Sequence, residues 1–303
     1  MQAVVEKTRP IAPDQMLLPL VPGRLYALQN TMSLDGRVAA YPASARGYAT
    51  VNCYLLTEPD AALMLDTGFT VHRSAILDGV EQIIGRDKPL TLFPLRLNEL
   101  MSLSNTMALA QRFPVDGCIS VLKDAAYHVD LESILPNDIA DAAGRLRTHL
   151  VAGNEWLNVG PGDGRPIKLF QSPVRLIATR WVHDPAARAL FTSDMFTGTW
   201  GADPGGPWIV DETNDDMTAA EMEAFMLNTR YWWLRGAKTD ALRRGLGELY
   251  AKCGDVEILA PGYGKIFKGS AVIARQFALL DEVLRRLDRS RMPQRYVSRD
   301  EEF

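Results

Sequence analysis

Short apolar runs alternate along the chain with segments of helical periodicity, a pattern typical of a layered α/β protein. The first two runs are VNCYLLT at 51–57 and AALMLDTGF at 61–69. Glu58-Pro59-Asp60 separates them, and turn residues between two β-favouring runs predict a hairpin.

The same alternation continues to the C-terminal part of the chain. Further strands are predicted at 90–95, 118–122, 167–171, 174–182, 187–194 and 256–261. Helices are predicted at 71–85, 105–112, 218–234, 237–252 and 270–289. Gly85 is a plausible stop for the first helix, and Thr218 and Glu221 have the spacing of a capping box. Residues 198–216, rich in Gly, Pro, Asp and Trp, predict a long loop.

This order of elements favours one compact domain over two. We expect the domain to cover residues 24–289. The Pro-rich residues 1–23 are expected to form an N-terminal arm on the surface, and residues 290–303 a charged C-terminal tail.

Composition and charge exclude several classes of protein. The chain has 303 residues, of which 47% are hydrophobic, and 33 Lys and Arg against 37 Asp and Glu give a net charge of −4. This balance argues against a partner bound through phosphate neutralisation, so no nucleic acid is expected. No apolar run reaches the roughly 18 residues that a membrane span needs, and no secretory signal is recognisable. Three widely spaced cysteines in apolar settings predict buried free thiols and a cytoplasmic location.

Histidine is scarce, which limits the metal chemistry open to this chain. The four histidines are His72, His128, His149 and His183, and no two of them have the spacing of a metal-ligand pair. Each is expected to be a core or surface residue, with His72 the strongest candidate for a site because it follows an Asp-Thr-Gly turn.

Four segments resemble the metallo-β-lactamase superfamily, and most of all the diiron domain of flavodiiron and related oxygen-binding proteins. They are NCYLL followed by LMLDTG, LRLNELMSLSN at 95–105, SPVRLIATRWVHDPAARALFTSDMF at 172–196, and LAPGYGKIFKG at 259–269. The resemblance covers about residues 24–270 and implies a four-layer αββα sandwich that binds two metal ions. It also implies an oligomer, since flavodiiron proteins are dimers. A flavodoxin domain and its phosphate-binding glycine loop are not expected.

The family's metal ligands are largely replaced in this chain. The resemblance places four residues on the ligand run, Leu97, Glu99, Met101 and Ser102, with Arg175 and Tyr263 on the later histidine positions. Asp194 falls on the bridging carboxylate. A side chain such as leucine cannot coordinate a metal, and a guanidinium repels one. We therefore expect no cofactor, and dinuclear hydrolase or diiron chemistry is not expected.

Arg175, Asp194, Tyr263 and Glu99 are the candidate pocket residues. Arg175 is expected to replace the metal charge by pairing with Asp194, either to keep the old cavity satisfied or to bind an anionic ligand. Asp66 is expected to support the ligand loops.

Aromatic residues form a second cluster, made up of Trp200, Trp208, Tyr231, Trp232 and Trp233. Successive aromatic residues cannot all face one side of a helix, so at least one of the last three is expected to be exposed. They suit an interface, a ligand lid or the packing of the helical layer.

Three hypotheses about function remain, and they leave open whether the chain is an enzyme. The first is a degenerate, non-catalytic protein that regulates a catalytic paralogue, as a homo- or hetero-oligomer. The second is a metal-free acid–base enzyme, or a binder of an anionic small molecule, in the remodelled pocket. The third is a metalloenzyme that holds iron or zinc with an unusual ligand set of Asp194, Glu99, His72 and Asp66.

Overall fold

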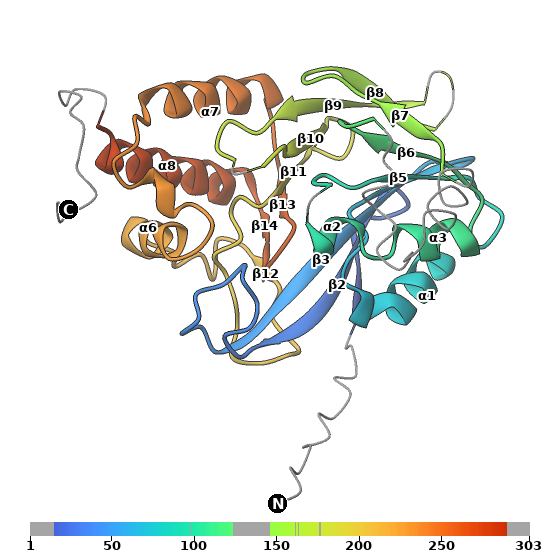
Figure 1. Cartoon of the computed structure of the whole chain (residues 1–303), viewed down its shortest axis with the longest axis horizontal. Helices are drawn as coiled ribbons and strands as arrows, with labels where there is room; N and C mark the ends of the chain where they lie inside the picture. The colour runs from blue at the N-terminus through green and yellow to red at the C-terminus, as the bar shows by residue number, and fades with distance from the viewer. Residues whose placement is uncertain are drawn as a thin grey trace, which may run out of the picture.

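The computed structural model describes residues 15–97, 99–123, 146–160, 162, 164–175 and 177–289 (Figure 1). The expected tail at 290–303, the first fourteen residues of the expected arm, and His128 lie outside these residues. Within the described part of the chain, no helix is both long and apolar enough to cross a membrane.

One sheet is built from the first half of the chain. Among the described residues it has seven strands in sequence order, β1 (Gln15–Val21), β2 (Leu25–Leu34), β3 (Gly47–Thr57), β4 (Ala62–Leu65), β5 (Leu90–Phe93), β6 (Val115–Ser120) and β7 (Thr148–Leu150). The first four strands are antiparallel, and β4 to β7 are parallel. The expected hairpin is confirmed as β3 and β4, which pair from Tyr54–Leu65 to Thr57–Ala62.

The second half builds a matching sheet. Its strands within the described part of the chain are, in spatial order, β12 (Ile209–Val210), β14 (Ile266–Lys268), β13 (Ile258–Pro261), β11 (Ala189–Ser193), β10 (Arg180–Asp184), β9 (Arg165–Gln171) and β8 (Trp156–Val159). The strands at the centre of this sheet are buried along their whole length, which explains why they appear in the sequence as continuous apolar runs.

Helices cover the outer faces of the two sheets (Figure 1). On the first sheet lie η1 (Thr70–His72), α1 (Arg73–Ile84), α2 (Leu100–Leu103) and α3 (Thr106–Arg112). On the second lie α6 (Ala219–Leu227), η2 (Trp232–Leu234), α7 (Asp240–Cys253) and α8 (Ser270–Leu287). One hydrophobic core fills the space between the sheets and a further core lies under each helical layer, so the expected four-layer αββα sandwich is confirmed.

Local sequence signals locate several of these helices correctly. Helix α1 ends at Gly85, whose φ of 68° favours glycine. The capping box of α6 is formed, with Thr218 accepting from the backbone of Glu221 and Glu221 accepting from the backbone of Thr218. The three cysteines are buried and free, as expected. Trp232 is the exposed member of the Tyr231–Trp233 aromatic run.

Two expectations about the strands are wrong. Residues 15–21, assigned to a surface arm, form β1 and pair with β2, because the segment is largely apolar and its proline, Pro19, is tolerated in a strand at the edge of the sheet. The strand expected at 174–182 begins only at Arg180. Before it, the Ser172 hydroxyl donates to the carbonyl of Val174, and the Ser172 amide donates to Thr179 O, so the segment closes as a loop.

Two buried histidines make the stability of this fold dependent on pH. His72 and His183 each have one ring nitrogen without a hydrogen-bond partner, and burial lowers the pKa of both. In the unfolded chain each imidazole has a pKa of about 6.5 and therefore takes up a proton more readily than in the folded protein. The free energy of unfolding should thus be highest above pH 6.5 and should fall as the pH drops below it. Urea unfolding at pH 7.5 and 5.5 measures this loss, which His183→Gln should reduce. An unchanged loss in that variant would contradict the assignment.

Candidate functional site

The loops that follow four core strands meet at one edge of the sandwich. They carry Arg96 after β5, Asp194 after β11 and Tyr263 after β13, and the turn after β4 carries Asp66. Asp66 and Ser193 have positive φ values of 58° and 54°, which are uncommon for residues with a side chain and which mark tightly constrained turns.

Asp194 is the centre of the site. Its Oδ1 accepts hydrogen bonds from Nη1 of Arg96 and from Nη1 of Arg230, so two guanidinium groups share one carboxylate oxygen. Arg96 is completely buried and Asp194 nearly so. A buried guanidinium cannot lose its proton, so Asp194 supplies the counter-charge that Arg96 requires.

Glu99 adds a second carboxylate to this cluster. Its Oε2 lies 3.4 Å from Nη2 of Arg230 and 3.8 Å from Nη1 of Arg96. Two guanidinium groups and two carboxylates therefore balance in formal charge. We call Arg96, Arg230, Asp194 and Glu99 the arginine–carboxylate cluster.

Tyr263 covers the cluster with its ring. The guanidinium carbon of Arg230 lies 5.1 Å from the ring centre and that of Arg96 lies 5.9 Å from it, both within cation–π range. Burial raises the pKa of the Tyr263 phenol, so the phenol stays protonated at neutral pH.

Neighbouring backbone holds Arg96 in place. The amide of Leu95 donates to Oδ1 of Asp66 at 2.8 Å, which fixes the chain just before Arg96. Gly262 lets the backbone after β13 pass close to Ser193 and to the guanidinium group of Arg96. A Cβ at Gly262 would lie 3.1 Å from the carbonyl oxygen of Ser193 and 3.5 Å from Nη2 of Arg96. The expected supporting position of Asp66 agrees with this geometry, and burial raises the pKa of its carboxyl.

The structure brings together three of the four expected pocket residues, namely Asp194, Glu99 and Tyr263. Arg175 does not join them. It is exposed on the loop at 172–179, where it donates to the carbonyl of Ser172 at 2.7 Å and lies near α7. The expected pairing of Arg175 with Asp194 is therefore wrong, because the closed loop before β10 carries Arg175 away from the strand ends.

Arg96 and Arg230 pair with Asp194, which is the role that was expected of Arg175. Arg96 lies between two leucines in the apolar segment LFPLRL, and Arg230 follows the apolar helix α6. A lone arginine inside an apolar segment was the available signal, because such a charge needs a buried partner. The pattern does not show, however, which carboxylate that partner is.

Neither the residues at the family's ligand positions nor the ligand set of the third hypothesis assembles into a metal site. Leu97 is buried among Leu103, Cys118 and Leu146, and Met101 faces Nη2 of Arg96. His72 is buried against Phe69, so the unusual ligand set of Asp194, Glu99, His72 and Asp66 is not assembled. Across the described ranges, no group of three or more His, Cys, Asp or Glu side chains could hold a metal ion.

Comparisons with solved structures show which fold this is. The chain superposes on rubredoxin oxygen:oxidoreductase from Desulfovibrio gigas with a TM-score of 0.61 and 15% identity, over 89% of this chain and 62% of that one. This is the metallo-β-lactamase-like fold of flavodiiron proteins.

Two other flavodiiron proteins match as well. A mutant flavo di-iron protein from Thermotoga maritima gives a TM-score of 0.61 at 16% identity, over 90% of this chain and 62% of that one. The flavodiiron protein from Giardia intestinalis gives 0.61 at 14%, over 89% of this chain and 59% of that one. The chain thus spans about three fifths of their lengths, and the expected resemblance is confirmed for the fold. No family model and no curated protein sequence matches.

The residues present do not fit the two iron ions that the names of these neighbours imply. Iron in such a centre needs imidazole and carboxylate donors. In this chain, one oxygen of Asp194 is taken by two guanidinium groups, and their fixed charges would repel a cation beside that carboxylate.

Replacing Asp194 should destabilise the fold strongly. Asp194→Asn removes the counter-charge of a buried arginine, which we expect to cost about 3–5 kcal/mol of unfolding free energy. Asp255→Asn is the matched control, since it breaks an exposed pair with Arg188 and should cost about 1 kcal/mol or less. Urea denaturation of both variants measures the difference. Equal losses in the two variants would show that Asp194 is not the centre of the cluster.

Proposed function

We propose that this protein is non-catalytic and acts by binding, as the regulatory partner of a catalytic paralogue whose metal ligands are intact. The observation that carries this proposal is the pairing of Asp194 with both Arg96 and Arg230. Two permanent positive charges there keep the ligand loops together, which preserves the fold and its surface without a metal.

An acid–base enzyme built from the same residues is less well supported. Both guanidinium groups are already paired with carboxylates, so neither is free for an anionic substrate. The cavity that Asp194 lines measures about 20 Å³, which is room for about one water. Tyr263 is a weak proton donor, because burial raises its pKa.

Exposed apolar side chains next to the cluster support a binding role. Leu100 follows Glu99 directly and is 58% exposed, and Trp232 lies two residues after Arg230 and is 65% exposed. Since Glu99 and Arg230 are in contact, Leu100 and Trp232 lie on backbone segments that meet at the cluster. Val71 is 61% exposed and lies three residues after Gly68, whose amide donates to the carbonyl oxygen of Met101. We call these three residues the rim patch. We infer that these exposed apolar side chains serve a protein interface, where large exposed apolar side chains are typical.

Co-expression tests the proposal. The chain, produced together with a flavodiiron protein from the same cells that has intact histidine ligands, should form a complex visible by size-exclusion chromatography and native mass spectrometry. Leu100→Glu with Trp232→Glu should abolish that complex, because charges replace the rim patch at the interface.

Trp156→Glu is the matched control for this experiment. Trp156 is a similarly exposed tryptophan, 56% exposed, but it lies on β8 and outside the rim patch. The proposal fails if the co-expressed chain elutes alone, or if the control variant disrupts the complex as much as the double variant.

A further inference from the structure

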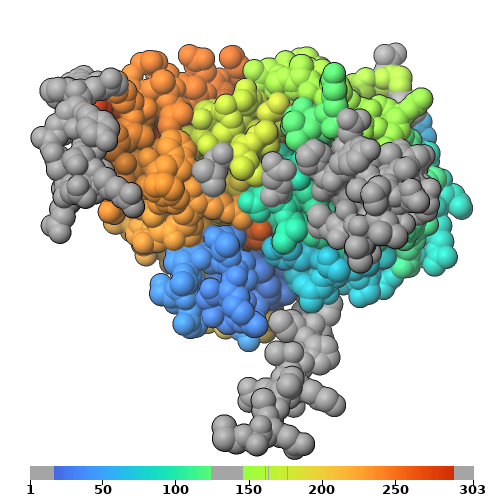
Figure 2. Space-filling model, viewed as in Figure 1, coloured from blue at the N-terminus to red at the C-terminus, as the bar shows by residue number. Residues whose placement is uncertain are grey.

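A second cavity lies apart from the arginine–carboxylate cluster. It measures about 780 Å³, within the range of about 300–1,000 Å³ that small-molecule sites occupy. Its walls come from the β2–β3 loop, from α6, from β14 and from the predicted long loop at 198–216. In the space-filling view the β2–β3 segment, in blue, lies against the α6 segment, in orange (Figure 2). We call this cavity the α6 pocket.

Aromatic rings separate the α6 pocket from the cluster. Tyr41 is buried between them, with its ring centre 6.3 Å from that of Tyr263 and 5.9 Å from those of both Trp200 and Phe225. The pocket therefore has its own chemistry and does not depend on Asp194.

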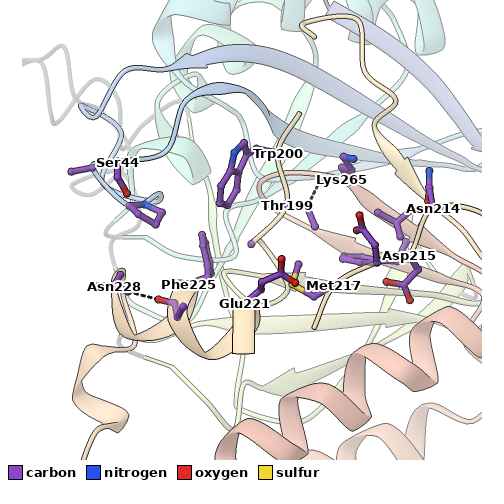
Figure 3. Close-up of a pocket in the computed structure, with 17 residues that line it drawn as sticks. Ser44, Thr199, Trp200, Asn214, Asp215, Met217, Glu221, Phe225, Asn228 and Lys265 are labelled. Carbon is purple, nitrogen blue, oxygen red and sulfur yellow. Dashed lines mark hydrogen bonds between the residues drawn. The ribbon is translucent and has the colours of Figure 1, made fainter. Parts of the chain in front are cut away.

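Trp200 and Phe225 form one wall of the α6 pocket (Figure 3). Their rings are 6.4 Å apart and tilted by 36°, and Trp200 is 37% exposed. The ring of Tyr41 packs edge-on against the indole of Trp200, at an interplanar angle of 88°, and so supports the indole in its position. A supported indole that is still open to solvent offers its face to a planar ligand or to a cation.

Carboxylates dominate the polar part of the lining. Asp215, Asp216 and Glu221 line the pocket, against the single ammonium group of Lys265. Hydrogen bonds from Thr218 lower the pKa of Glu221, so Glu221 is ionised at neutral pH. Figure 3 shows Asp215 and Lys265 across the pocket from Trp200 and Phe225.

Asp215 is a buried carboxylate in the wall of the pocket. Its side chain is only 5% exposed, and its Oδ1 accepts from Gln276 at 2.9 Å and pairs with Arg275 at 2.7 Å. Its Oδ2 has no hydrogen-bond partner in the described part of the protein. That oxygen is shielded from solvent, so Asp215 adds negative charge to the pocket wall, while the exposed carboxylate of Asp216 is open to a bound donor.

We propose that the α6 pocket binds a small aromatic amine in its protonated form. The ring stacks on Trp200 beside Phe225, and the ammonium group donates to the carboxylate of Asp216, near the negative charge of Asp215. An aromatic wall next to excess negative charge selects an organic cation over a neutral or anionic ligand of equal size.

Isothermal titration calorimetry of the full chain tests this proposal with three indole probes. Tryptamine should bind in the millimolar range or tighter, neutral indole more weakly, and indole-3-acetate more weakly still. Trp200→Ala and Asp216→Asn should each weaken tryptamine binding by about tenfold, since each removes one of the two attractive elements. Trp156→Ala and Asp255→Asn, at exposed sites outside the pocket, should leave binding unchanged.

Three results would overturn the assignment. They are the absence of tryptamine binding to the folded wild-type chain, tighter binding of indole-3-acetate than of tryptamine, and tryptamine affinity that both pocket variants leave intact. Circular dichroism of Trp200→Ala and Asp216→Asn verifies that these variants remain folded, and both positions are partly or fully exposed.

Discussion

One oxygen of Asp194, shared by two guanidinium groups, is the interaction on which this end of the molecule depends. Arg96 is fully buried, so its position is stable only while the carboxylate of Asp194 stays beside it. Arg230 then ties the end of α6 to the same atom, and Tyr263 closes over both arginines. Loops from both sheets are thereby held together, as metal ions would hold them in a dinuclear centre.

This arrangement explains how the loops at this edge of the fold can be held together by ion pairs. A dinuclear centre supplies positive charge that compensates carboxylates and draws loops inward. Here Arg96 and Arg230 supply that positive charge. The carboxylate of Asp194 balances one of the two guanidinium charges, and that of Glu99 balances the other. The exposed apolar residues on the loops around the cluster suit the binding role that we propose.

The architecture of this protein could be predicted from sequence because its signals are local or periodic. The capping box of Thr218, the stop at Gly85 and the buried apolar strands each follow from short-range chemistry, and their alternation indicates a layered α/β fold. The four-layer sandwich itself was implied by the family resemblance. The meeting of Asp194, Glu99 and Tyr263 followed from the resemblance. Arg175 was misplaced because the Ser172 hydroxyl closes a loop where apolar residues suggested a strand. Arg96 and Arg230 were missed because their partner lies 98 and 36 residues away along the chain, and no periodic pattern encodes such a pairing.

The metal content of untagged protein, purified without chelator and measured by plasma mass spectrometry, tests the central claim most directly. If the two arginines stand in for metal ions, the folded protein should contain less than about 0.1 equivalent of iron, zinc or manganese. It should stay at that level after incubation with ferrous iron and removal of the excess. One or two equivalents of a single metal, retained by the wild-type chain and lost in Asp194→Asn, would contradict the account.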